Sequence, residues 1–380
     1  MRNINYIVIF CIHLLISVSI SAQDSTIFKG QASVWMNYNG GNDLPVYAGG
    51  RYIPQVNSAF RLKNDHKIDF EASVNLNGSV GFNPFDSLKA TGKIKPYRIW
   101  ARYSTRQFEV RAGLQKLNFG SASLLRPLMW FDQVDPRDPL KLTDGVWGIL
   151  GRYYFLNNAN IWLWGLYGNS KPRGWEPSGT NNNYPEEGGR IQLPVPKGEV
   201  AFTYHHRIAD TRNLGGLMSG FDKVPENKFG FDMKLDLLVG FWLEGSWTKK
   251  NKDLGIFTNQ EIMNAGIDYT FGLGNGLYVI YEQLVAANDQ KPFLFQNTAS
   301  FSLLSLSYPI GISDNISGIV YYDWKNKDSY NFINWQKQFK NLTLYLMGYW
   351  NPKNYNIPAQ GEGQNLFAGR GVQIMLVYNH

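Results

Sequence analysis

Apolar and polar residues alternate over short segments along most of the chain. Residues 107–115 read QFEVRAGLQ and residues 228–236 read KFGFDMKLD, so that every second residue is apolar. Residues 199–207 follow the same pattern. Period-two alternation over about ten residues, bounded by Gly, Asn, Asp or Pro, predicts β-strands with one apolar and one polar face.

Counting these segments predicts 18 strands, with boundaries uncertain by about two to four residues. The connections are expected to alternate in length, with the tight turn 64–66 lying between longer connections at 39–56 and 81–92. Short turns on one side and longer loops on the other are typical of outer-membrane barrels. We therefore predict an all-β fold, a transmembrane antiparallel up-and-down β-barrel of about 18 strands (16–18). The expected strands are 28–38, 57–63, 67–80, 93–104, 106–119, 145–155, 159–168, 189–194, 198–207, 228–236, 240–249, 260–271, 276–286, 296–308, 314–324, 328–338, 341–350 and 366–378.

The polar face of these strands cannot contact hydrocarbon, where a charged side chain costs about 2–4 kcal/mol at the membrane midplane. In a barrel it would line the lumen, whereas in a soluble sandwich, the alternative fold, it would face water. Aromatic residues at strand ends, such as Tyr153-Tyr154-Phe155 and Tyr349-Trp350, favour the barrel. Tyr and Trp prefer the membrane interface because each combines an apolar ring with a polar group.

The first 22 residues predict a cleaved signal peptide. Arg2 precedes an apolar run from Ile4 to Ile20, and the small residues Ser21-Ala22 follow it. A membrane anchor is the alternative, but the run is short for that role. We expect a signal peptide at 1–22, one barrel domain at 23–380 and a location in the cell outer membrane. The only cysteine, Cys11, lies in the leader, so no disulfide is expected in the mature chain.

The mature chain would be moderately basic. Removing Arg2 from the 37 Lys and Arg residues leaves 36 against 30 Asp and Glu, a net charge of +6. This balance favours affinity for anionic lipid headgroups, or a pore that prefers anions. No dense Lys/Arg cluster is present, so nucleic acid is not expected as a partner.

Residues 124–144 interrupt the strand pattern. Pro127, Pro136 and Pro139 each fix φ and remove a backbone donor, and two Asp-Pro pairs predict turns. The segment nevertheless begins LLRPLMWF, an apolar content that a solvated loop would not normally carry. Long ordered loops in compact proteins are usually functional. We expect this long loop to fold into the lumen of the barrel.

Charged side chains at a constriction set the selectivity of a pore. We hypothesise that carboxylates of the long loop face a basic wall across the lumen and create a transverse field that orients polar or anionic solutes. In the alternative, these charges pair locally and only hold the loop in place. The candidates are Arg126, Asp132, Asp135, Arg137 and Asp138 in the loop and Arg98, Arg102, Arg111 and Arg152 on the adjoining strands.

Other chemistries were considered. An aromatic track for saccharides could involve Trp100, Trp130, Trp147, Trp162, Trp164 and Trp175. His205 or His206 could form a dyad with Asp210, but adjacent strand residues point to opposite faces, so at most one histidine faces the lumen. No lipase-type serine motif is present.

A calcium site is a further alternative. Asp132, Asp135 and Asp138 carry oxygen ligands suited to calcium, yet Asp-Pro turns explain two of the three more simply. We predict no enzymatic activity, metal or cofactor.

Three stretches resemble porin-like barrels of Bacteroidota: residues 97–103 (YRIWARY), 113–120 (GLQKLNFG) and 125–132 (LRPLMWFD). The second stretch, before a long loop, also resembles more loosely the alginate-export type of 18-stranded barrel. The resemblance covers about 60 residues. It implies an outer-membrane channel and names no solute.

The final strand alternates from Val372 to Tyr378 and ends in an aromatic residue, although Asn379-His380 follow. It resembles the recognition signal of the outer-membrane assembly machinery. We predict a porin-like channel for passive diffusion of small polar solutes, with anions and saccharides as candidates. Outer-membrane lipid and further copies of the chain are expected partners. The alternative is a non-conducting barrel that anchors or receives a polysaccharide or a partner protein.

Overall fold

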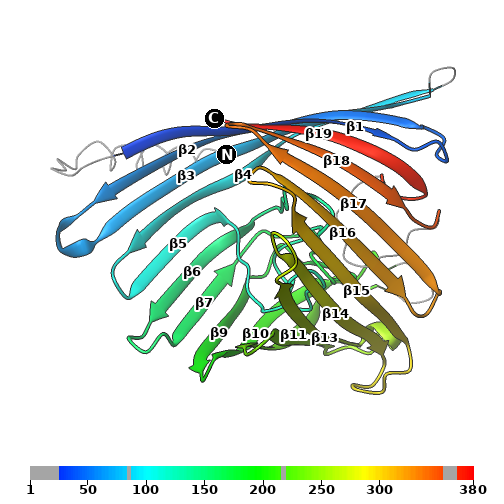
Figure 1. The fold of residues 1–380 in the computed structure, drawn as a ribbon. Coiled ribbons are helices and arrows are strands. Elements are labelled where there is room, and N and C mark those ends of the chain that lie inside the picture. The colour runs from blue at the N-terminus through cyan, green and yellow to red at the C-terminus, as the bar shows by residue number, and fades with distance from the viewer. Residues whose placement is uncertain (1–24, 84–86, 215–219, 354–365) are drawn as a thin grey trace.

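The computed structural model describes residues 25–83, 87–214, 220–353 and 366–380. Its strands form one sheet of 19 members, of which β8 (Gly179–Thr180) is a two-residue addition to the edge of β10. The other 18 form a closed antiparallel barrel, because the first strand pairs with both the second and the last (Figure 1). The predicted fold class is confirmed. No helix in the described ranges is long and apolar enough to cross a membrane.

The barrel strands are β1 (Ser25–Tyr38), β2 (Val46–Arg61), β3 (Lys67–Phe82), β4 (Leu88–Ser104), β5 (Phe108–Gln115), β6 (Val146–Tyr154), β7 (Asn160–Leu166), β9 (Glu186–Val195), β10 (Gly198–Asp210), β11 (Val224–Asp236), β12 (Gly240–Lys250), β13 (Asn259–Phe271), β14 (Leu277–Asp289), β15 (Thr298–Pro309), β16 (Asp314–Asp323), β17 (Asp328–Gln338), β18 (Leu342–Trp350) and β19 (Arg370–Asn379). Two short 3-10 helices, η1 (Lys63–Asp65) and η2 (Gly255–Phe257), lie in connections. At one end of the barrel, which we call the turn end, the connections contain two to five residues. The opposite end is called the loop end.

Each predicted strand overlaps an observed one, but several boundaries were wrong. β2 begins at Val46 and β4 at Leu88, so the connections predicted at 39–56 and 81–92 are much shorter. Pro54 belongs to β2, where it pairs with Gly30 of β1 while the ladder to β3 is interrupted. Lengths also do not alternate strictly, since the loop-end connection 324–327 is as short as a turn.

The two faces of the barrel differ as predicted. On β11, Glu226, Lys228 and Asp232 are buried inside the barrel, whereas Phe229 is exposed on its outside. His205 and His206 on β10 point to opposite faces, with His205 buried inside. Apolar side chains are exposed around the outer surface, among them Val34, Ile149, Leu163, Phe202, Met263, Ile267, Leu304, Val320, Ile333, Leu346 and Ile374.

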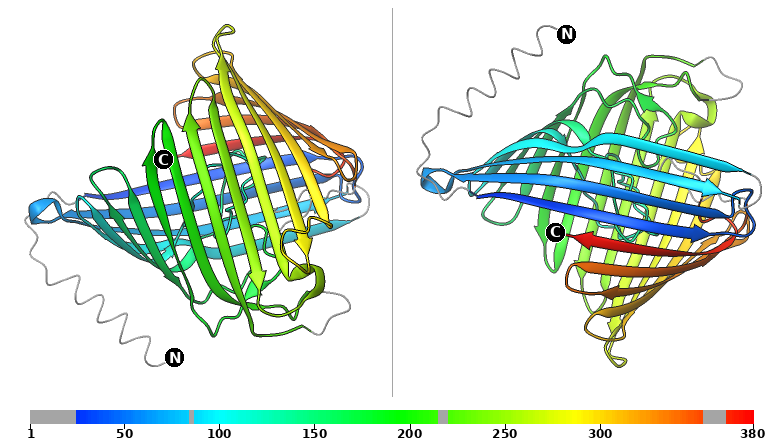
Figure 2. Two further views of the ribbon diagram at one scale, coloured as in Figure 1. Left: turned by 90° about the horizontal axis from the view of Figure 1, so that it is seen from below. Right: turned by 90° about the horizontal axis from the view of Figure 1, so that it is seen from above.

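The barrel wall is uneven in height. β5, β6 and β7 contain 8, 9 and 7 residues, whereas β4 contains 17. β4 therefore pairs with β5 only over Ile99–Ser104, and residues 88–98 have β3 as their only neighbouring strand in the described chain. The long, adjacent strands β1–β4 are visible in the right view of Figure 2. The strand predicted to reach Phe119 ends at Gln115, because the chain turns inward there.

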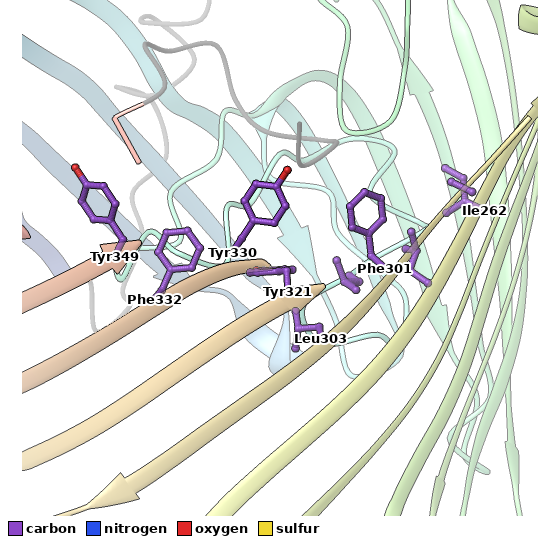
Figure 3. Packing of buried hydrophobic residues seen from close by; sticks show 10 residues of the cluster. Ile262, Phe301, Leu303, Tyr321, Tyr330, Phe332 and Tyr349 are labelled. Carbon is purple, nitrogen blue, oxygen red and sulfur yellow. The ribbon is translucent and has the colours of Figure 1, made fainter. Parts of the chain in front are cut away.

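Two connections enter the lumen after the short strands: residues 116–145, called the inner segment, and residues 167–185, called the second loop. Figure 3 shows inward side chains of β13 and β15–β18, including Phe301, Tyr321 and Phe332, in one cluster. Leu125 of the inner segment belongs to this cluster and Trp175 of the second loop packs against it. The hydrophobic core therefore lies inside the barrel, between the wall and the two inward connections.

Candidate functional site: a cavity in the barrel lumen

The inner segment is attached to the wall through three buried carboxylates, which we call the carboxylate clamp: Asp232 of β11, Glu244 of β12 and Glu282 of β14. The backbone N–H groups of Ser123 and Leu125 donate to Glu282 at 2.8 and 2.6 Å. No strand in the described part of the chain pairs with the inner segment, so its amides need other acceptors. The clamp supplies them.

Glu244 and Asp232 complete the attachment. Glu244 accepts the N–H groups of Ala122 and Leu128 at 2.8 and 2.6 Å, and Asp232 accepts the Ser121 hydroxyl at 2.8 Å. Each clamp residue lies more than a hundred positions after the inner-segment residues that it binds. Sequence analysis did not find them, because a lone inward carboxylate looks like any other polar lumen residue.

The apolar half of the inner segment packs as predicted. Leu125, Leu128, Met129, Trp130 and Phe131 are all buried. Trp130 and Phe131 cluster with Val146, Leu150, Trp164 and Leu166 of the short strands. The prediction that the long loop folds into the lumen is confirmed.

Two arginines of the inner segment pair with aspartates of the same segment. Arg126 binds Asp132 at 2.7 Å and Arg137 binds Asp135 at 2.5 Å. Asp138 accepts the N–H group of Leu140 at 3.0 Å. Among the described residues, no three His, Cys, Asp or Glu side chains form a group that could hold a metal ion, so the three aspartates do not come together as a calcium site.

The four strand arginines also have partners nearby. Arg102 binds Asp69 at 2.9 Å, and Arg152 and Arg111 approach Glu109 at 3.0 and 3.5 Å. These contacts hold the wall of β3–β6 together. Arg98 instead donates to the Thr143 carbonyl at 2.9 Å, which fixes the end of the inner segment.

A cavity of about 790 Å³ separates the second half of the inner segment from the lumen face of β2–β4. Four predicted constriction residues line it: Asp132, Asp135, Arg137 and Asp138. The other five, Arg98, Arg102, Arg111, Arg126 and Arg152, are not in its lining.

The basic wall opposite the inner segment consists instead of Arg51, Lys93 and Lys95. Arg51, Asn77 and Lys93 are register partners across β2, β3 and β4, and Asn75 pairs with Lys95. These side chains therefore form two neighbouring rows on one face of the sheet. Arg51 lies within the connection predicted at 39–56, so it was not among the predicted inward-facing residues.

Positive charge prevails in the cavity, whose lining holds six Lys or Arg and four Asp. Lys95 pairs with Asp144 at 2.5 Å. The buried Nε of Arg51 has no hydrogen-bond partner among the described residues. Burial raises the pKa of Asp138, so this carboxyl takes up its proton at a higher pH than a free aspartate does.

An ion network holds the second loop against β10 and β11. Arg207 binds Glu176 at 2.8 Å and Glu226 at 2.5 Å, and Lys228 also pairs with Glu176. Burial alone would raise the pKa of Glu176, but Arg207, Lys228 and Arg173 more than offset it and hold the pKa below its ordinary value. The second loop is therefore attached by ion pairs, whereas the inner segment is attached mainly by hydrogen bonds from backbone amides to carboxylates.

The histidines do not form the dyad considered above. Asp210 pairs with Arg212 at 2.5 Å. His205 is fully buried, its Nε2 lies 3.2 Å from a Glu186 carboxylate oxygen, and its Nδ1 accepts a hydrogen bond from the indole N–H of Trp164. The His205 ring contacts the rings of Trp130, Phe131 and Trp164.

The six tryptophans considered for a saccharide track are dispersed. Trp147 is exposed on the outer face, whereas Trp130 and Trp164 are buried in the inner cluster. Trp162 and Trp100 stack against Arg152 and Arg111, at 3.8 and 4.8 Å. Trp175 donates to the Arg126 carbonyl at 2.8 Å. None of the six belongs to the cavity lining.

Neither a protein-family model nor a curated protein sequence matches this chain. Solved structures match it in fold. OccK5 (OpdH) of Pseudomonas aeruginosa aligns with a TM-score of 0.57 at 11% identity, covering 93% of this chain and 98% of that one. OccAB1 of Acinetobacter baumannii gives 0.56 at 9% identity, covering 96% and 97%. OmpT, an outer membrane protein of Vibrio cholerae in its trimer form, gives 0.54 at 9% identity, covering 94% and 99%. The chain therefore has a porin-like barrel fold over nearly its whole length.

Proposed function

We propose that this protein is an outer-membrane channel through which small polar solutes, anions in particular, diffuse passively. The apolar outer surface of the barrel suits a bilayer, and its polar inner face suits water. The observation that carries the proposal is the cavity between the inner segment and the wall of β2–β4, in which cationic side chains outnumber carboxylates. Fixed charge at such a site selects solutes by sign.

The transverse field becomes part of this proposal in a revised arrangement. Asp135 and Asp138 of the inner segment face Arg51 and Lys93 across the cavity. Arg98, Arg102, Arg111 and Arg152 contribute the positive potential of the neighbouring wall while pairing with their own partners. Low-dielectric walls strengthen such a field.

Planar-bilayer recording of the refolded chain tests the proposal. A salt gradient should give stable single-channel steps with an anion-selective reversal potential. An Arg51→Ala, Lys93→Ala double variant should shift that potential towards cation selectivity. Lys340→Ala is the matched control, because this exposed lysine lies in a turn-end connection outside the cavity. An unchanged reversal potential in the double variant, or an equal shift in the control, would contradict the proposal.

The second candidate is a non-conducting barrel that anchors or receives a surface polysaccharide or a partner protein. It is favoured by the amount of apolar packing inside the barrel, where the inner segment and the second loop join the cluster of Figure 3. A folded barrel that gives no conductance steps would place this function first. In that case the double variant Arg98→Ala, Arg102→Ala would give no conductance steps either.

We extend the proposal to the export, location and assembly of the protein. The predicted leader at 1–22 lies outside the described residues, and N-terminal sequencing of protein from an outer-membrane fraction tests its cleavage. The resemblance to porin-like barrels of Bacteroidota supports the same location. We also propose that β19 is recognised by the barrel-assembly machinery and that the barrels associate as homo-oligomers.

A further inference from the structure

Large aliphatic side chains project from the turn end of the barrel. Leu238, between β11 and β12, is 95% exposed, and Ile312, between β15 and β16, is completely exposed. Together with Leu237, Leu273, Ile310 and Phe339 they occupy the four successive connections from β11 to β18; we call these six residues the apolar arc. Turn positions normally favour Gly, Asn, Asp, Ser or Pro, so this composition requires a reason.

The other side of the same end is charged. The connection between β2 and β3 contains Lys63, Asp65 and His66, and that between β4 and β5 contains Arg106. Arg106 and Asp65 form an ion pair at 2.5 Å, with both side chains mostly in solvent. The turn end is therefore charged at β2–β5 and apolar at β11–β18, and the exposed Leu156 between β6 and β7 is a further apolar side chain that lies outside the arc.

The apolar arc continues the surface that contacts lipid. On β13 the outward residues Ile267, Tyr269 and Phe271 are each about half exposed, and Leu273 follows directly in the turn. An apolar strand surface that meets its turn without a polar boundary indicates that the hydrocarbon region extends close to the turn.

Four backbone amides of the apolar arc already have partners within these turns. Leu237 N–H donates to the Val239 carbonyl at 3.1 Å, and Leu273 N–H to the Phe271 carbonyl at 2.8 Å. Ile310 N–H donates to the Asp314 carbonyl at 2.9 Å, and Phe339 N–H to the Leu342 carbonyl at 2.7 Å. Unpaired backbone groups are what normally exclude turns from lipid, and here those donors are paired.

We propose that the apolar arc inserts into the lipid of the adjoining leaflet, so that the barrel is seated deeper on its β11–β18 side than on its β2–β5 side. The partner is the bilayer itself, with acyl chains against Leu238, Leu273 and Ile312. The exposed Lys340 beside Phe339 is placed to contact a lipid phosphate, as basic residues flanking inserted apolar groups do.

Site-directed spin labelling tests this inference, since Cys11 is the only cysteine. In a Cys11→Ser background, Leu238→Cys and Ile312→Cys carry a nitroxide, and Arg106→Cys on the charged side is the matched control. The probe is a vesicle of equal parts phosphatidylethanolamine and phosphatidylglycerol, with no other protein. Labels at 238 and 312 should show an oxygen-to-nickel accessibility ratio several-fold above that at 106, because oxygen partitions into lipid and the nickel complex stays in water.

Two outcomes would overturn the proposal. Nickel accessibility at 238 and 312 equal to that at 106 would place the apolar arc in water, available to a soluble partner. Low accessibility to both reagents, with spin–spin broadening that grows with the protein-to-lipid ratio, would mean that a second copy covers it. Because these side chains lie outside the core, the labelled variants should keep the heat-modifiable migration of the folded barrel, and Leu273→Cys serves as a third position.

Discussion

Removing Glu282 should release the start of the inner segment. The Glu282 carboxylate accepts the N–H groups of Ser123, Leu124 and Leu125, at 2.8, 3.1 and 2.6 Å, in a fully buried site. Glu282→Ala leaves these three donors without their acceptor. A buried donor that loses its partner costs about 1–3 kcal/mol.

For Glu282→Ala the cost per donor should lie at the lower end of that range. Three donors at about 1 kcal/mol each give about 3 kcal/mol, because the variant also avoids burying a charge and admits water to the gap. Since about 1.4 kcal/mol corresponds to a tenfold change, the equilibrium between the attached and the released inner segment should shift by about 100-fold towards release. The barrel itself should remain closed, because no strand pairing is altered.

Limited trypsinolysis and bilayer recording measure this shift. Cleavage after Lys141 should accelerate roughly in proportion to the released population, and the single-channel conductance should rise as the lumen clears. The matched control is Glu261→Ala on β13, which removes a carboxylate that accepts the N–H group of Phe293 in a different loop. If Glu282→Ala shows the cleavage rate and conductance of the control, the clamp does not hold the inner segment and the reasoning fails.

Three further predictions concern the loops and the cavity. Gly174 has φ of +50°, and an added Cβ would lie 1.8 Å from the Met129 carbonyl oxygen, so Gly174→Ala should lower the melting temperature. Gly168→Ala is the control: Gly168 also has a positive φ, +79°, but an added Cβ would have no atom within 4 Å, so this variant measures backbone strain without the clash. Because the pKa of Glu176 is depressed in the folded protein, ionised Glu176 stabilises the fold at pH values above the ordinary glutamate pKa of 4.5. This stabilisation is lost as the pH falls through the lower pKa of the folded state. Below about pH 4 the melting temperature of the wild type should therefore fall more steeply with pH than that of Glu176→Gln. The raised pKa of Asp138 has the opposite sign, since its proton is taken up at a higher pH than in a free aspartate. Anion selectivity should rise as pH falls through that pKa, and reversal potentials of Asp138→Asn should lack this part of the pH dependence.

The fold could be predicted from local alternation because each strand shows its two environments in its own sequence. QFEVRAGLQ and KFGFDMKLD place their polar residues inside the barrel, as the structure has them. Prediction failed where local signals conflicted. Pro54 suggested a loop, yet a proline is accommodated in β2 because the ladder to β3 is interrupted there. Lys116–Phe119 continue the strand pattern but enter the lumen, a choice made by tertiary contacts.

The candidate site was predictable only in part. Proline spacing and apolar content identified the inner segment, and four of its charged residues line the cavity. The cavity lining holds none of the four strand arginines. Alternation shows that Arg98, Arg102, Arg111 and Arg152 face inward but not which acid each one meets. Glu109 alone engages three of them, Arg102, Arg111 and Arg152. Arg51 and Lys93 are register partners of the same Asn77, a relation between strands that no single strand reveals.

The carboxylate clamp also orders assembly in time. Its hydrogen bonds join residues separated by 111 positions for Ser121 and Asp232 and by 159 for Ser123 and Glu282. The inner segment precedes these acceptors in the chain and is synthesised before them, so Leu125, Leu128 and Phe131 stay uncovered until β11–β14 have paired. Long-range contacts of this kind form late and leave aggregation-prone intermediates. The lumen is therefore filled in the closing steps of barrel formation, and a barrel halted halfway would present its future interior to chaperones.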